Sequence, residues 1–158
     1  MTKVLLIFHV LAAVIAIGPV TAAGSMFPGA ARKAIAAPGD ADAAAAVRLL
    51  HRICRVYAVI GLAIPVFGFA TASSMHVLGS PWLVTAMILT TIAALVLALL
   101  VLPAQEAILA GLAGGETWAA HLWRARAQQL AALTGLFNLL WATVTVLMIV
   151  RPGSTTGA

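Results

Sequence analysis

The most constraining feature of this chain is an uncharged apolar stretch that runs from Val4 to Phe27. A helix of about 20 apolar residues is long enough to cross the hydrocarbon core of a bilayer, and this stretch exceeds that length. Inside lipid every backbone polar group must be bonded within its own segment, which favours a helix over any other structure for an isolated span. We therefore predict that residues 4–27 form the first of several membrane spans.

The composition extends this prediction to the whole chain. Of its 158 residues, 63% are hydrophobic and only 8% are charged, whereas soluble domains carry about 25% charged residues. This number of charges is too small to cover a globular surface. We therefore expect lipid to solvate much of the chain. Three more apolar segments follow, at residues 56–75, 82–102 and 130–150. The prediction is an all-α, single-domain protein over residues 1–158, a bundle of four transmembrane helices in which the second and fourth extend into the cytoplasm.

Turn-forming and capping residues set the predicted helix ends. The Pro-Gly pair at Pro28 should end the first span, and Pro103 should end the third. Asp40 is expected to cap the helix that leads into the second span, and Ser80 to cap the third. Pro65 should kink the second span.

The distribution of basic residues predicts an orientation. Two stretches, around the first and third loops, are basic; they contain Arg32, Lys33, Arg48, Arg52, Arg55, Arg124 and Arg126. The opposite side has only Lys3 and Arg151. By the positive-inside rule, both termini lie outside and the two long loops lie in the cytoplasm. The net charge of +5 then matches lipid headgroups and not nucleic acid.

A cleaved signal peptide is the alternative interpretation of the first span. Lys3 is a minimal positive region, and the small residues at 21–23 are a passable cleavage site. The apolar run is longer than the roughly 7–15 residues of a signal peptide, however, and Gly18-Pro19 interrupts it late.

Arginines at positions 48, 52 and 55 repeat at helical spacing and should form one face. We expect Arg48, Arg52 and Arg55 to lay their stems along the apolar surface and to place their guanidinium groups at the lipid headgroups.

His9 is the one titratable residue within the first span. A helical projection places it on the face of Ala12, Ala16 and Ala23, and small residues mark helix contacts in membranes. His9 should therefore point into the bundle, where Asn138 or a threonine is a candidate hydrogen-bond partner. On the last span, Thr134, Asn138, Trp141 and Thr145 share one face, which should also turn inward.

The predicted topology groups the four histidines into two pairs. His9 and His76 lie toward the outer side, and His51 and His121 toward the cytoplasm. Histidines from neighbouring helices ligate haem b in membrane bundles, so each pair is a candidate haem site. A hydrogen-bonded core histidine is the competing interpretation for His9. Cys54 is the only cysteine, which excludes a cysteine metal cluster and is typical of a small buried apolar residue.

Four short segments carry a resemblance to a known family. They are KVLLIFHVLAA at 3–13, MFP at 26–28, LHRICR at 50–55 and FNLLW at 137–141. Together they resemble a family of small bacterial, actinobacterial-type integral membrane proteins of unknown function, which implies a four-helix inner-membrane protein. More distantly, His9 and its surroundings are similar to membrane-bound protoporphyrinogen oxidases and copper-resistance D-type proteins, some of which bind haem.

Three functions follow as expectations. The first is a non-catalytic accessory subunit that packs against a larger membrane complex or self-associates, because the chain carries no evident catalytic constellation. The second is a membrane redox protein that binds haem b through His9. The third is a transporter of a small neutral solute, which a chain of this length would perform as a homo-oligomer.

Overall fold

The computed structural model describes residues 2–114 and 120–153, and this part of the chain consists of helices and the turns that join them. The elements are α1 (Thr2–Ala36), α2 (Ala41–Ile60), α3 (Ala63–Ser74), α4 (Pro81–Leu95), the π-helical segment η1 (Val96–Val101), α5 (Leu102–Ala113) and α6 (Ala120–Val150).

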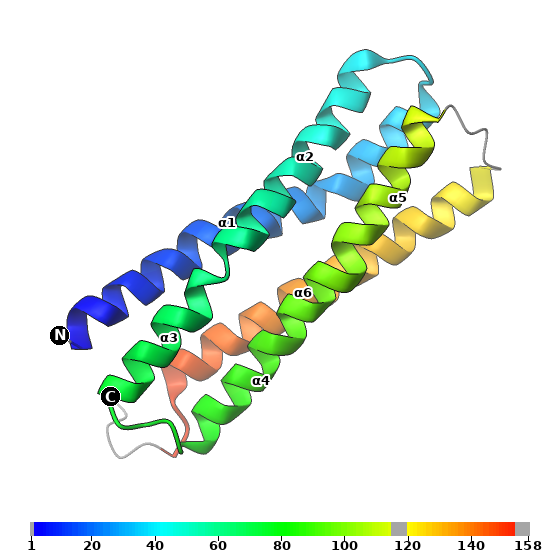
Figure 1. Cartoon of the computed structure of the whole chain (residues 1–158). Coiled ribbons are helices and arrows are strands. Elements are labelled where there is room, and N and C mark those ends of the chain that lie inside the picture. The colour runs from blue at the N-terminus through cyan, green and yellow to red at the C-terminus, as the bar shows by residue number, and fades with distance from the viewer. Residues whose placement is uncertain (1, 115–119, 154–158) are drawn as a thin grey trace.

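These elements combine into four long helical units that lie side by side (Figure 1). The helix α1 lies along α2 and α3, and the continuous unit α4–η1–α5 lies along α6. Each unit is long and apolar enough to cross a membrane, as predicted, with lengths of 34, 34, 33 and 26 residues in their apolar ranges. At 1.5 Å per residue the longest units span roughly 50 Å, whereas the hydrocarbon core of a bilayer is about 30 Å thick.

Two predicted helix ends are wrong. The helix α1 passes through Pro28 and continues to Ala36, so the helix does not end at residue 27. The third unit likewise passes through Pro103 and reaches Ala113. The π-helical segment accommodates Pro103 within the helix. Just before the proline, the amide of Leu102 donates to the carbonyl of Leu97, five residues back, in place of the α-helical partner four residues back.

The predicted caps and kink lie where the sequence placed them. Asp40 accepts hydrogen bonds from the amides of Asp42 and Ala43, both at 3.0 Å, at the start of α2. Ser80 precedes α4, although its side chain makes no capping bond. The second unit breaks between α2 and α3. Pro65 has no amide hydrogen to donate to the carbonyl of Gly61, four residues earlier. That carbonyl instead accepts a hydrogen bond from the amide of Ile64 at 3.0 Å.

The core is thin and the outer surface is apolar. Small and aromatic residues fill the centre, with Ala16, Phe27 and Phe137 almost fully buried. Large apolar side chains point outward along the helices: Val14, Leu139 and Ile149 are 67%, 65% and 75% exposed. A water-soluble monomer rarely exposes contiguous apolar surface on this scale.

Candidate functional site

His9 lies between α1 and α3. Its Nδ1 donates to the carbonyl oxygen of Ile64 at 3.0 Å, and its ring covers the backbone of Gly68. A Cβ built on Gly68 would lie 2.9 Å from His9 Cε1 and 3.1 Å from Nδ1, so no other residue type fits beneath the ring without movement. His9 thus faces the bundle on its small-residue side, but its partner is a backbone carbonyl and not Asn138 or a threonine.

His76 occupies a different place. It follows α3 in the left-handed conformation (φ 56°) and is exposed. Its amide donates to the carbonyl of Ser73, and the amide of Val77 donates to that of Ala72, which together form a Schellman cap. Since His76 lies eight residues beyond Gly68, roughly 12 Å along a helix axis, the structure does not bring it beside His9.

His51 belongs to a buried polar network that joins three helices. Its Nδ1 donates to Gln105 Oε1 at 3.0 Å, and its Nε2 lies 3.7 Å from Glu106 Oε1. Gln105 Nε2 in turn lies 3.6 Å from Cys54 Sγ, and that thiol points to the carbonyl of Val20 at 4.0 Å. Gln105 and Cys54 are completely buried, so this network fixes the positions of α1, α2 and α5 relative to one another.

Sequence reasoning missed the α5 side of this network. Because Pro103 indicates a helix end, the sequence predicts that Glu106 lies in a solvated loop, whereas the structure places Gln105 and Glu106 on α5. The side chain of His121, the predicted partner of His51, lies outside the described part of the structure. Among the residues that are described, no group of three or more His, Cys, Asp or Glu side chains is placed to hold a metal ion.

The polar stripe of α6 meets α1 over part of its length. Thr134 Cγ2 lies 3.1 Å from where a Cβ of Gly24 would stand, and Asn138 Nδ2 donates to Ser25 Oγ at 3.1 Å. Thr145, by contrast, is exposed and bonds to the carbonyl of Trp141, so it does not join this contact.

Three buried polar atoms of this stripe lack a partner among the described residues. They are Thr134 Oγ1, Asn138 Oδ1 and Trp141 Nε1. Orphaned buried groups of this kind are rare and raise local strain or mark ordered water.

The arginines of α2 point away from the bundle. Arg48, Arg52 and Arg55 are exposed, whereas Val47 and His51 on the adjoining face are buried. The predicted single basic face therefore forms on the outer side of α2.

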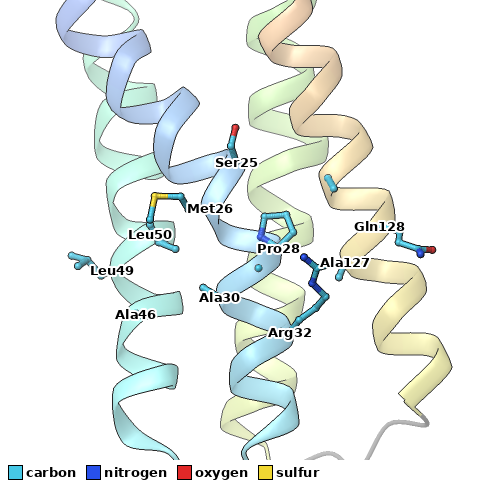
Figure 2. Close-up of a pocket in the computed structure, with 12 residues that line it drawn as sticks. Ser25, Met26, Pro28, Ala30, Arg32, Ala46, Leu49, Leu50, Ala127 and Gln128 are labelled. Atoms are coloured by element: carbon cyan, nitrogen blue, oxygen red, sulfur yellow. The ribbon is translucent and has the colours of Figure 1, made fainter.

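A groove of about 670 Å³ lies over α1, between α2 and α6 (Figure 2). Its walls are mostly apolar, with Met26 from α1 and Leu49 and Leu50 from α2. Two polar residues of α1, Ser25 and Arg32, lie two turns apart along it. The sequence did not indicate this groove, because the predicted end at Pro28 placed Gly29, Ala30 and Arg32 of its α1 wall beyond the first helix.

No model of a known protein family, no curated protein and no solved structure matches the chain. The resemblance to a bacterial family of unknown function therefore stays a prediction.

Proposed function

We propose that the chain is a multi-pass protein of the bacterial inner membrane and a non-catalytic accessory subunit. One observation carries the proposal: reactive side chains hold the bundle together while apolar side chains face outward. His9 binds a carbonyl of α3, and His51 and Cys54 tie α2 to α5 and α1. These side chains act as structural contacts between helices, and the outer surface is suited to lipid or to other membrane helices.

The charges support an orientation for this bundle. Arg32, Arg48 and Arg52 lie toward the end where α1 turns into α2, and the opposite end, with the α3–α4 turn, has few charges. We place the basic end in the cytoplasm and both termini outside, following the positive-inside rule.

The outward face of α1 offers a place for a partner helix. Gly18 and Ala22 are exposed four residues apart, and the space beyond the Cβ position of Gly18 is open. A pair of small residues at this spacing lets two helix backbones approach closely in a membrane. The partner is a larger membrane complex or a second copy of the chain.

Affinity purification from membranes in a mild detergent tests this role. We expect a stoichiometric partner to co-purify, and Gly18→Leu to reduce its recovery while the protein still accumulates in the membrane. A partner-free single chain from both wild type and variant would contradict the accessory role.

Haem b binding through His9 is the second candidate, and a specific contact favours it. Because Nδ1 of His9 donates to the Ile64 carbonyl, Nε2 is the nitrogen that carries the lone pair. A histidine held in this way through one ring nitrogen is oriented to ligate a metal through the other. His9 would hold the haem iron through Nε2. A haem iron there would supply one-electron chemistry.

A reduced-minus-oxidised spectrum of the purified protein tests the haem candidate. We expect a haem α band that is lost in His9→Ala and kept in His76→Asn, a control that tolerates the left-handed backbone. The absence of any band from haem-sufficient cells, or a band that survives His9→Ala, would contradict it.

A further inference from the structure

The groove between α2 and α6 has the size and lining of a ligand site. Its volume of about 670 Å³ lies within the range of about 300–1,000 Å³ that is typical of small-molecule pockets. Its apolar wall contains Met26, 63% exposed, and Leu49, 58% exposed. Small residues from α1 and α6, including Gly29 and Ala127, also line the groove.

The polar groups of the groove are complementary to a phosphodiester and an ester. Arg32 extends between α1 and α6 (Figure 2), and no ion pair or hydrogen bond joins it to another side chain within residues 2–114 and 120–153. Ser25 Oγ accepts a hydrogen bond from Asn138 Nδ2, which leaves the hydroxyl hydrogen of Ser25 to donate. Arginine binds phosphate oxygens with charge-assisted hydrogen bonds.

The groove lies at the depth of the lipid headgroups under the proposed orientation. Ala16 lies against Gly61 and His9 against Gly68, and this antiparallel register places the groove beside the stretch of α2 that carries Arg48 and Arg52. Those arginines are exposed and mark the level of the headgroups on the cytoplasmic side. The charged end of the groove therefore lies farther from the hydrocarbon than its Ser25 end.

We propose that this groove binds one anionic phospholipid of the cytoplasmic leaflet. The phosphate binds Arg32, an acyl ester carbonyl accepts from Ser25, and the first part of an acyl chain lies against Met26 and Leu49. The proposal rests on the membrane insertion argued above and adds a specific lipid site to it.

Native mass spectrometry of the full chain in detergent, with added phosphatidylglycerol or phosphatidylcholine of the same acyl chains, tests the site. Wild type should retain one phosphatidylglycerol in preference to phosphatidylcholine. Arg32→Gln should weaken that binding roughly tenfold, the loss of about one charge-assisted contact. The matched control Arg48→Gln removes the same charge from the outer face of α2 and should leave the affinity unchanged.

A second pair of variants tests the cavity without altering charge. Gly29→Leu fills the groove, and nothing lies within 4 Å of its Cβ position, so the bundle should fold normally. Gly79→Leu adds the same side chain at the α3–α4 turn, also in open space, as a control. We expect phosphatidylglycerol binding to be lost in Gly29→Leu and kept in Gly79→Leu.

Three results would overturn the lipid site: equal retention of both lipids, unchanged binding in Gly29→Leu, or equal losses in Arg32→Gln and Arg48→Gln. Alkaline carbonate extraction separates this failure from a failure of the membrane proposal. A protein that resists carbonate but fails the lipid test keeps its membrane assignment and loses the site, whereas a protein released by carbonate loses both.

Discussion

Replacing Gly68 with alanine should break the contact that fixes α3 against α1. The added Cβ would stand 2.9 Å from His9 Cε1, a separation that Cβ atoms essentially never show, and 3.1 Å from Nδ1, which is tighter than most Cβ contacts. The ring must therefore move away from α3, which removes its 3.0 Å bond to the Ile64 carbonyl.

The expected cost follows from three contributions. Overpacking at a tight contact costs about 1–3 kcal/mol, and the lost hydrogen bond about 0.5–1.5 kcal/mol. Alanine in a helix interior regains about 0.5–1 kcal/mol relative to glycine. Together these ranges predict that Gly68→Ala lowers the free energy of unfolding by about 0.5–4 kcal/mol. Gly18→Ala, with nothing within 4 Å of its Cβ position, is the matched control and should be unchanged or slightly more stable.

A double-mutant cycle with His9→Ala isolates the contact. The free energies of unfolding are measured by titrating sodium dodecyl sulfate into mixed micelles and following the fluorescence of the four tryptophans. Without the ring, alanine at position 68 has room, so the two substitutions should couple by at least about 1 kcal/mol. Additive effects, or a Gly68→Ala protein as stable as Gly18→Ala, would refute the His9–α3 contact.

Three further changes probe other parts of the bundle. Gln105→Leu leaves the buried Nδ1–H of His51 without its acceptor and should lower the free energy of unfolding by about 1–3 kcal/mol, whereas the exposed Gln129→Leu should have little effect in the same titration. Asp40→Ala removes two hydrogen bonds from the start of α2 and should cost about 0.5–2 kcal/mol, with fraying that amide hydrogen exchange detects in the first turn. Thr134→Val replaces a buried hydroxyl that has no partner among the described residues, so its free energy of unfolding should stay equal or rise; a loss above about 1 kcal/mol would show that the hydroxyl is bonded, for instance to water.

The four-helix fold could be predicted from the sequence because long apolar runs follow a simple rule. A long uncharged run in a chain with few charges has one stable structure in a bilayer, and the runs here are unambiguous. The position of His9 on the inner face was also predictable, because it depends only on helical spacing and on neighbouring alanines.

The helix ends near Pro28 and Pro103 were not predictable, because a proline that usually ends a helix in a soluble protein can lie inside a helix in a packed bundle. Pro28 and Pro103 lack an amide hydrogen, which ends most helices in soluble proteins. In this bundle neighbouring helices and a π-helical segment accommodate them, so both helices continue. That error hid the groove and the α5 residues that bond to His51.

The polar contacts were not predictable, because they depend on how far each helix is shifted along its neighbours. Nothing in the sequence distinguishes Gln105 from a loop residue, or the Ile64 carbonyl as the partner of His9. Cys54, in contrast, was predicted as a buried small residue, and it is completely buried.

The central claim, a bundle that crosses the membrane with its basic end in the cytoplasm, has one direct test. Single cysteines are placed in the two turns at opposite ends of the bundle, Ala37→Cys between α1 and α2 and Gly79→Cys between α3 and α4. Native Cys54 is fully buried and makes wild type the background control. A membrane-impermeant maleimide should label Gly79→Cys in intact cells and Ala37→Cys only after the membrane is permeabilised. Labelling of Ala37→Cys from outside intact cells would contradict the orientation, and labelling of both cysteines from one side would contradict the membrane-spanning bundle.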